Sequence, residues 1–364
     1  MLTPESRSGR KPYPEPVPYR STGIVYDPIF LEHGMVNHIE SPRRLESVID
    51  GLETAGLRQQ LINIPIRKAT LEEILQVHDE EYIHRLSHYC QEGGGWWDED
   101  TFMSPQTYEV ALYAAGSSIQ AVEAVVSGKV HDVYALVRPP GHHARPSDAM
   151  GFCVLNNISI AAKYALNHLG VKKICIIDFD VHRGNGTQEI FSKEPRILYV
   201  SSHQYPIFPD ISLVEKSSAM RKRERAILLP LPAGSGDNEF RKVYSEIVVP
   251  VVRKFKPQLI LVSAGYDAHW ADGMSNLRLT VDGYLFLLKL IDNLALELYG
   301  GGTVYFLEGG YNLNILTACI NNTFRFWLGE NFVEDPLGAP PHDIRGYRVE
   351  YVIERLKRRY RLIT

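Results

Sequence analysis

The sequence predicts a single α/β domain built on a mainly parallel sheet. Apolar, β-branched runs alternate with segments of helical periodicity over most of the 364 residues, which is typical of strand–helix–strand units. Several of these runs are almost continuously apolar, as expected of parallel strands that are buried on both faces. Neither an internal repeat nor a Ser/Gly-rich linker divides the chain, so one domain is favoured over two.

The expected strands are short runs rich in valine, isoleucine and leucine, at Gly23–Tyr26, Val133–Val137, Lys173–Phe179, Ile197–Ser201, Leu259–Ser263 and Thr303–Leu307. The expected helices fill the gaps between them, at Arg43–Leu61, Thr70–His78, Pro105–Val126, Leu155–Leu169, Glu239–Phe255, Val281–Tyr299 and Ile315–Leu328. One of these helices opens with a capping-box pattern formed by Thr70 and Glu73. Residues 1–20 are polar, proline-rich and without an apolar period, so we expect an N-terminal extension there and the domain at 21–364.

The composition excludes several classes of protein. Lys and Arg number 39 against 43 Asp and Glu, a net charge of −4, so no strong basic field exists to hold nucleic acid. The apolar runs are far shorter than the ~20 residues of a membrane span, and residues 1–20 lack the apolar core of a secretory signal. The cysteines form no CxxC pair, which argues against a thiolate zinc site or a disulfide scaffold and fits a cytoplasmic setting; they are Cys90, Cys153, Cys175 and Cys319.

Polar residues that could carry chemistry gather where the expected strands end, which is where ligands bind in open α/β sheets. Directly after the apolar run Ile174–Ile177, the segment Asp178-Phe-Asp180-Val-His182 places two carboxylates and an imidazole on one side of the strand. Three such groups are costly to bury unless a cation lies between them, so a divalent metal is favoured. The alternative is turn chemistry, in which an aspartate at a strand end caps the next helix.

Asp267 stands just past the expected strand Leu259–Ser263 and could complete this set. Asp180, His182 and Asp267 would supply two carboxylates and one imidazole, and three protein ligands leave a position open for water, as in catalytic zinc sites. Such a water has its pKa lowered to about 7. Oxygen-rich ligation would also accept Fe²⁺. Taken alone, Asp267 is better interpreted as a loop carboxylate that caps a turn.

Adjacent histidines, His142 and His143, follow the turn Arg138-Pro-Pro-Gly. The prolines and the glycine of this turn aim both rings in a defined direction. A metal-bound water needs a general base, and a leaving amine needs an acid. Asp178 could orient one ring and raise its basicity. The alternative is a surface histidine pair.

A further segment, Leu307-Glu-Gly-Gly-Tyr311, follows the last expected strand. Its two glycines permit close approach of the backbone, and the phenol of Tyr311 could donate to an oxyanion opposite the metal. The alternative for this tyrosine alone is a packed loop aromatic.

Taken together, these segments resemble the histone deacetylase and acetylpolyamine amidohydrolase family, part of the arginase/deacetylase fold group. The segments are RPPGHHA (138–144), GFCVLNN (151–157), IDFDVHRGNGTQEIF (177–191), VSSHQYPIFP (200–209), VSAGYDAH (262–269) and LEGGY (307–311). The likeness covers about residues 22 to 330, and the number and order of the motifs make it specific. It implies a three-layer α/β domain with a mainly parallel sheet of about eight strands flanked by helices, and a deacetylase-like catalytic domain at 21–364.

The resemblance implies a catalytic role for five residues. His143 would act as the principal general base and then as the acid, with Asn185 behind its ring. His142 would be mainly an electrostatic stabiliser, backed by Asp178. Tyr311 would polarise the substrate carbonyl. The GNGTQ run around Asn185 is similar to the class II and bacterial branch.

The resemblance also implies binding residues. The Zn²⁺ ligands would be Asp180, His182 and Asp267. The acyl-lysine channel would be lined by Gly151, Phe152 and Phe208. A monovalent-cation site, normally K⁺, would be formed by Asp178, Asp180, His182, Ser201 and Ser202. Arg44 would lie near an inner cavity.

The sequence departs from the family pattern at a few positions. Arg183 stands where many members have a second histidine, and Ile39 interrupts an expected His-Pro-Glu. At the channel mouth, Met274 takes the position of the acidic gatekeeper of polyamine-selective members, which favours an acyl-lysine or neutral amide, although Asp272 is close by. The loop Gly93–Met103 would carry the rim of the site, and its aromatic residues would shape substrate choice.

The expected function is therefore a zinc-dependent amidohydrolase that removes an acetyl or another short acyl group from an acylated lysine-type amine. One alternative is an acetylpolyamine deacetylase. Another is a non-catalytic acyl-lysine binding module, against which the intact His142, His143 and Tyr311 argue. An arginase-like ureohydrolase would need two Mn²⁺ ions and further carboxylates. The expected partner is an acylated lysine or a small acylated amine, with no nucleic acid or membrane, and self-association through residues 1–20 stays open.

Overall fold

The structure is a computed structural model that describes residues 20–35, 37–209, 226–341 and 349–360. An eight-stranded sheet forms its centre, in the order β2-β1-β5-β10-β9-β6-β7-β8, and all neighbouring strands are parallel. The strands are β1 (Thr22–Val25), β2 (Ile62–Asn63), β5 (Asp132–Ala135), β6 (Ile174–Asp178), β7 (Ile197–Gln204), β8 (Ala226–Leu231), β9 (Leu259–Ala264) and β10 (Thr303–Leu307). The predicted α/β class and parallel sheet are confirmed.

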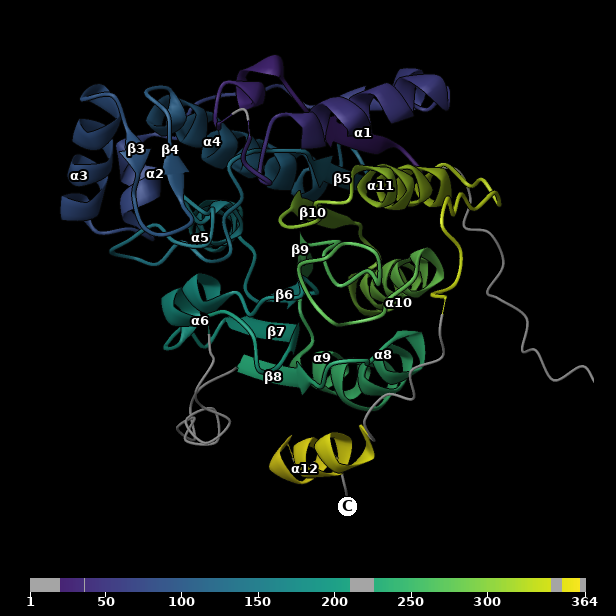
Figure 1. Ribbon diagram of the computed structural model, residues 1–364. Coiled ribbons are helices and arrows are strands. Elements are labelled where there is room, and N and C mark those ends of the chain that lie inside the picture. Colours follow the sequence, from purple (N-terminus) through teal and green to yellow (C-terminus); the bar gives the residue numbers. More distant parts are fainter. Residues whose placement is uncertain (1–19, 36, 210–225, 342–348, 361–364) are drawn as a thin grey trace, which may run out of the picture.

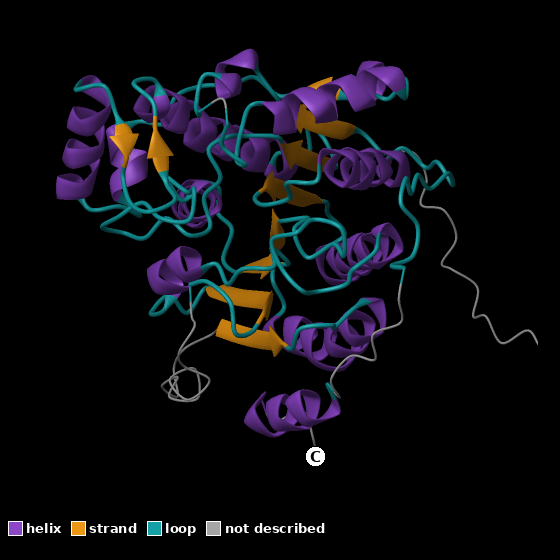
Figure 2. Ribbon diagram, viewed as in Figure 1, coloured by secondary structure: helices purple, strands orange, loops and turns teal. Residues whose placement is uncertain are grey.

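Helices cover both faces of this sheet and complete three layers (Figures 1 and 2). One face carries α1 (Arg43–Thr54), α8 (Asp237–Val243), α9 (Val249–Phe255), α10 (Val281–Tyr299) and α11 (Leu313–Trp327). The other side carries α2 (Leu71–Leu75), α3 (Glu80–Gln91), α4 (Thr107–Val126), α5 (Asn157–His168) and α6 (Asn185–Phe191). A last helix, α12 (Glu350–Tyr360), lies near the edge strand β8.

The central strands are buried along their whole length, which explains their continuously apolar sequences. Every residue of β6 and of β9 is buried, because helices cover both faces. β6 pairs with β9 from Ile174↔Leu259 to Asp178↔Ser263, so the two strands end at the same level. The polar segments that follow them therefore emerge side by side at one edge of the sheet.

Edge strands are the elements that the sequence did not predict. β2 is a two-residue, exposed strand, and β8 contains Pro230. A proline lacks a backbone N–H and is tolerated in a sheet mainly on an edge strand, which is where β8 lies. A small antiparallel hairpin of β3 (Gly95–Trp96) and β4 (Phe102–Met103) was likewise not predicted.

Two predicted helices differ in extent or regularity. The helix expected over Arg43–Leu61 ends at Thr54, because Gly56 has φ +67° and the N–H of Leu57 donates to the carbonyl of Leu52, a Schellman ending. The helix expected over Glu239–Phe255 contains a π-helical turn, Tyr244–Val248, between α8 and α9. The predicted capping box of Thr70 and Glu73 is present at the start of α2. Helices α3, α6 and α12 were not predicted.

The predicted N-terminal extension lies outside the described residues except for Arg20. This residue is buried, and its Nη1 lies 2.8 Å from Oδ2 of Asp292 and 3.4 Å from Oδ2 of Asp132. Its ion pairs join it to α10 and β5, so Arg20 belongs to the packed domain and not to the extension. The four cysteines are buried and free, in agreement with the absence of a disulfide scaffold.

Candidate active site

Two neighbouring strand ends bring the three predicted metal-ligating residues together. Asp180 and His182 follow β6, and Asp267 follows β9. All three are buried, and one ligand atom of each lies within 4.8 Å of those of the others. Nδ1 of His182 is 3.1 Å from Oδ1 of Asp180 and 3.2 Å from Oδ2 of Asp267. The three predicted metal ligands therefore lie close enough together to bind one ion.

The donor set of this cluster fits a divalent cation. Oδ2 of Asp267 lies 3.2 Å from Nδ1 of His182 and has no hydrogen-bond partner among the described residues. Two glycines keep the space around the carboxylates clear, because they lack a Cβ. A Cβ added at Gly265 would lie only 2.0 Å from Oδ2 of Asp180, and one added at Gly309 only 2.3 Å from Oδ2 of Asp267. Burial opposes protonation, but the two carboxylates raise the pKa of His182 to about 10. Two buried carboxylates thus require a positive charge between them, and a cation satisfies this need.

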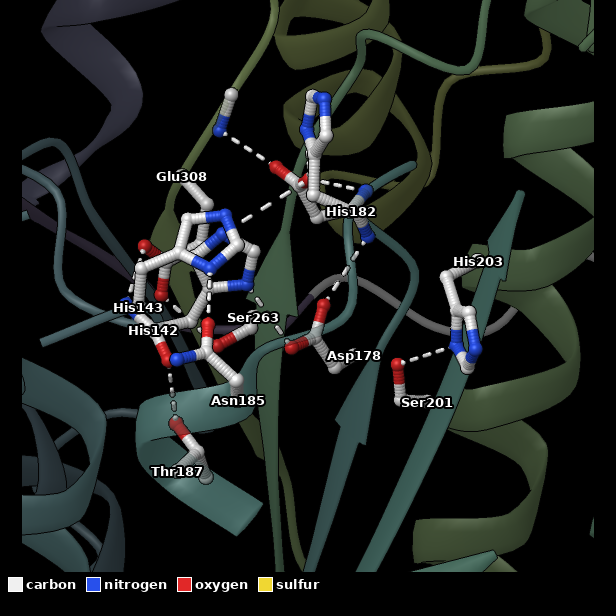
Figure 3. A network of polar contacts seen from close by, with 12 residues as sticks. His142, His143, Asp178, His182, Asn185, Thr187, Ser201, His203, Ser263 and Glu308 are labelled. Carbon is white, nitrogen blue, oxygen red and sulfur yellow. Dashed lines mark hydrogen bonds and ion pairs between the residues drawn. The ribbon is translucent and has the colours of Figure 1, made fainter. Parts of the chain in front are cut away.

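The tandem histidines lie beside this cluster, with their rings 4.0 Å apart between centroids (Figure 3). Nδ1 of His142 is 3.1 Å from Oδ2 of Asp178, and Nδ1 of His143 is 2.7 Å from Oδ1 of Asn185. An amide oxygen can only accept, so Nδ1 of His143 donates to it and Nε2 is left to take up a proton. Asn185 is the first residue of α6, and the start of this helix therefore orients the ring.

The two rings have opposite electrostatic surroundings. Burial opposes protonation of the first ring, but the neighbouring carboxylates of Asp180, Asp178 and Glu308 raise the pKa of His142 to about 10. Burial, together with His142 and His182, lowers the pKa of His143 well below its ordinary value. One ring is therefore held as a cation and the other as a neutral base, which is the division of roles that acid–base catalysis uses.

Glu308 is a functional candidate to which the sequence reasoning gave no role. It follows β10 and is fully buried. Its Oε2 accepts the backbone N–H groups of Gly141 at 2.8 Å and of His142 at 3.1 Å, and its Oε1 accepts the hydroxyl of Ser263 at 2.8 Å (Figure 3). This carboxylate therefore ties the histidine turn to the ends of β9 and β10. The sequence feature that could have indicated Glu308 is its position directly after the apolar strand Thr303–Leu307.

We expect Glu308→Leu to lower the free energy of unfolding by about 2–4 kcal/mol, because it leaves two buried backbone N–H groups without an acceptor. Glu308→Gln keeps a carbonyl oxygen of the same reach and should lose less than half as much. Urea denaturation of the two variants and the wild type measures the difference. Equal stability of the leucine and glutamine variants would show that these hydrogen bonds do not hold the turn.

Tyr311 follows β10 and packs against Arg44 and Phe152. Its ring lies under the guanidinium of Arg44, whose Cζ is 4.8 Å from the ring centroid. Arg44 is itself fully buried and donates to the carbonyls of Gly310 at 2.7 Å and of Glu308 at 2.5 Å. A carboxylate oxygen of Asp272 accepts the backbone N–H of Tyr311 at 2.7 Å. Burial raises the pKa of the Tyr311 phenol well above its ordinary value, so the phenol keeps its proton.

The two predicted channel phenylalanines pack on two different catalytic candidates, His143 and Tyr311. Phe208 packs edge-on against His143, with 5.2 Å between ring centroids, and Phe152 packs edge-on against Tyr311 at 5.9 Å. A Cβ at Gly151 would lie 2.7 Å from the ring of His143, so only glycine fits there. Met274, the fourth residue predicted for the channel, is half-buried. Its place at the channel mouth stays a prediction.

Of the residues predicted for a monovalent cation, Asp178, Ser201 and Ser202 lie on the neighbouring strands β6 and β7, and Asp180 and His182 follow β6. Asp178 pairs with Ser201 in the sheet. The hydroxyl of Ser202 is 3.4 Å from the carbonyl of Asp178 and 2.9 Å from the hydroxyl of Tyr244. All these side chains are buried. The structure brings the predicted group together, and K⁺ binding stays a prediction.

Comparisons with known proteins agree in one family. The chain matches the model of the histone deacetylase domain over residues 38–326. Histone deacetylase 14, chloroplastic, from Arabidopsis thaliana is 38% identical over 333 residues, which cover 86% of this chain and 78% of the relative. A probable deacetylase from Archaeoglobus fulgidus is 38% identical over 295 residues, 80% of this chain and 82% of the relative. The crystal structure of the HDA15 HD domain superposes with a TM-score of 0.80 at 32% identity, and the match covers 85% of this chain and 90% of that one.

Among the described helices, none combines the length and the apolar character that crossing a bilayer requires. The Arabidopsis relative is named as a chloroplast protein. The cytoplasmic setting inferred from the cysteines stays a prediction.

Proposed function

Given that the chain belongs to the histone deacetylase family and has a deacetylase, amidohydrolase-type function, we propose that it is a zinc-dependent enzyme that removes an acetyl or another short acyl group from an acylated lysine. The observation that carries this proposal is the convergence of Asp180, His182 and Asp267 beside a neutral histidine. The rings of His143 and His182 are 5.9 Å apart between centroids, so a base stands next to the cation cradle.

Asp180, His182 and Asp267 would hold Zn²⁺, and their oxygen-rich set would also accept Fe²⁺. When bound, the cation supplies Lewis acidity, which polarises an amide carbonyl and lowers the pKa of a water molecule. The two carboxylates would balance its charge. K⁺ beside Asp178 is a second proposed cation, and the hydroxyl of Tyr199, which donates to Oδ2 of Asp178 at 2.8 Å, helps to fix that carboxylate.

The residues of the chain would move the protons. Nε2 of His143 would take a proton from the attacking water, because its Nδ1 is committed to Asn185. The phenol of Tyr311 would donate to the oxygen that develops negative charge. His142, held as a cation by its carboxylate neighbours, would stabilise that charge. His143 would then return its proton to the leaving amine.

The walls of the channel favour a lysine stem. Phe208 packs on His143 and Phe152 packs on Tyr311, so both apolar rings border catalytic groups. An acylated lysine presents an uncharged methylene chain to such rings. Asp272 is close to the channel, but one of its oxygens is 2.7 Å and 2.8 Å from the backbone N–H groups of Tyr311 and Asn312. Its other oxygen, Oδ1, is buried and has no hydrogen-bond partner among the described residues, so the preference for acyl-lysine over an acetylpolyamine rests on the apolar channel walls.

The test compares metal content and turnover in one preparation. We expect about one Zn²⁺ or Fe²⁺ per chain in the wild type. We also expect the kcat/KM for an acetyl-lysine peptide to be higher than the kcat/KM for acetylputrescine. Asp267→Asn removes one ligand charge and should bind much less metal, while its fold, monitored by circular dichroism, stays intact. Elemental analysis of the two proteins checks this prediction.

Full metal content in Asp267→Asn would remove this residue from the ligand set. A metal-loaded wild type that binds acetyl-lysine peptides but never cleaves them would support the binding-module alternative and contradict the proposed reaction. A kcat/KM that is larger for acetylputrescine would transfer the assignment to an acetylpolyamine deacetylase.

A further inference from the structure

The hairpin β3–β4 beside the channel is firmly anchored. The N–H of Trp97 donates to the carbonyl of Thr101 at 2.8 Å, and the indole Nε1 of Trp97 donates to Asp148 at 2.9 Å. The backbone N–H of Phe152 donates to the hydroxyl of Thr101 at 3.2 Å, so the hairpin is joined to a channel wall. What this hairpin displays is therefore held in a fixed position.

Its neighbouring tryptophans differ in their surroundings. Trp97 is half-buried and packs on Tyr89, with 5.2 Å between ring centroids. One edge of the Trp96 indole packs against Phe102 across the hairpin, with 5.6 Å between ring centroids, but 50% of the surface of Trp96 stays exposed. The fold thus uses most of the Trp97 ring, whereas half of the Trp96 surface is left to the solvent.

Trp96 belongs to an apolar surface that reaches the channel. Its ring lies 5.8 Å from that of His38, and His38 packs edge-on against Phe152 at 4.9 Å. The next residue, Ile39, is 46% exposed. We call Trp96, His38 and Ile39 the rim shelf. Nε2 of His38 is 3.1 Å from the carbonyl of Asp100, so the shelf is fixed to the acidic turn of the hairpin.

The charges around the rim shelf are complementary to a cation. Asp98 and Glu99, both exposed, stand in the turn that follows Trp96 and Trp97. Elsewhere the fold places its own cations over exposed rings, as with Arg325 over Phe332 at 4.8 Å. Within the described residues no Lys or Arg lies over the ring of Trp96. Tryptophan is the aromatic side chain that binds cations best.

We propose that the rim shelf binds the side chain of an arginine or lysine that neighbours the acylated lysine in a polypeptide substrate. The aliphatic stem of that residue would pack on Ile39 and Trp96, and its cationic head would lie over the indole, facing Asp98 and Glu99. The inference rests on the proposed function, because it assumes that the acylated lysine enters between Phe152 and Phe208. It makes Trp96 a determinant of specificity rather than a catalytic residue.

The experiment uses two acetyl-lysine peptides that differ only in an arginine or a citrulline next to the acetyl-lysine. Citrulline keeps the shape of arginine and removes its charge. We expect the wild type to prefer the arginine peptide by about threefold to fivefold in kcat/KM, and the preference to shrink as the salt concentration rises. Trp96→Ala should abolish this ratio while the kcat on a single acetylated lysine, without flanking residues, stays within twofold of the wild type.

Phe332→Ala is the matched control, because it removes an exposed ring outside the rim shelf, and it should keep the wild-type ratio. The proposal is overturned if Trp96→Ala retains the preference, or if the wild type shows none. It is also overturned if the effect of Trp96→Ala appears for N-acetylspermidine and not for the peptides. The affinities of both peptides for the His143→Ala variant separate this proposal from the proposed reaction. If this variant binds the arginine peptide more tightly but the wild type cleaves neither peptide, the proposed function is refuted and the proposed binding by the rim shelf is not.

Discussion

Replacing His143 by alanine is expected to lower the kcat of deacetylation by about 10²- to 10⁴-fold. Nε2 of this ring is the proton acceptor that the hydrogen bond to Asn185 leaves available. The ring is not a proposed metal ligand, so the variant should keep the metal content of the wild type. Turnover of an acetyl-lysine peptide, measured together with elemental analysis, checks both statements.

The pH profile gives a second measurement of the same role. His143 accepts a proton only when it is neutral, and burial, His142 and His182 lower its pKa below 6.5. The kcat/KM of the wild type should therefore stay high at neutral pH and fall with decreasing pH only below 6.5. His168→Ala, which removes an exposed histidine of α5, is the control and should leave rate and profile unchanged. A fully metal-loaded His143→Ala variant with the rate of the wild type would exclude His143 as the base.

Tyr311→Phe is expected to lower kcat by about 10²- to 10³-fold, with little change in KM, because it deletes one donor to the developing oxyanion. The phenylalanine ring would still pack under Arg44, which lies 4.8 Å from the ring centroid. No hydrogen bond of the Tyr311 hydroxyl is present among the described residues, so the melting temperature should hardly change. Steady-state kinetics and thermal denaturation measure the two effects.

A suitable control is Tyr305→Phe, which removes a buried hydroxyl that has no hydrogen-bond partner in the described structure. Deleting such a group should leave kcat unchanged and cost no stability. If Tyr311→Phe and Tyr305→Phe have equal rates, the Tyr311 phenol takes no part in the reaction. A lower melting temperature together with a lower kcat would point to a structural role instead.

Local sequence was sufficient to predict the strands that carry the site. The run before Asp178 and the run before Asp267 are apolar throughout and fully buried in the sheet. The end of each apolar run predicts the end of a strand, so the sequence alone places the polar residues that follow at one edge of the sheet. Edge strand β8 escaped this reasoning because Pro230 weakens its strand pattern and only its position at the edge makes the proline harmless.

Long-range contacts could not be predicted in the same way. Glu308 contacts Gly141 and His142, which are 167 and 166 residues away in the chain. The helix that begins at Arg43 ends at Thr54, where Gly56 adopts a positive φ, although the apolar pattern continues to Leu61. The approach of the rim shelf to Phe152 likewise depends on His38, which belongs to a different loop from Trp96.

The sequence by itself determined which side chains are available for chemistry, because apolar runs specify buried strands and the residues that follow them must lie at the sheet edge. The tertiary structure decided how these groups act on one another. Two carboxylates converge on His182 only because β6 and β9 end at the same level, and His143 stays neutral only because it is buried against two other imidazoles. Distances and burial set electrostatic energies, and neither quantity is a local property of the chain.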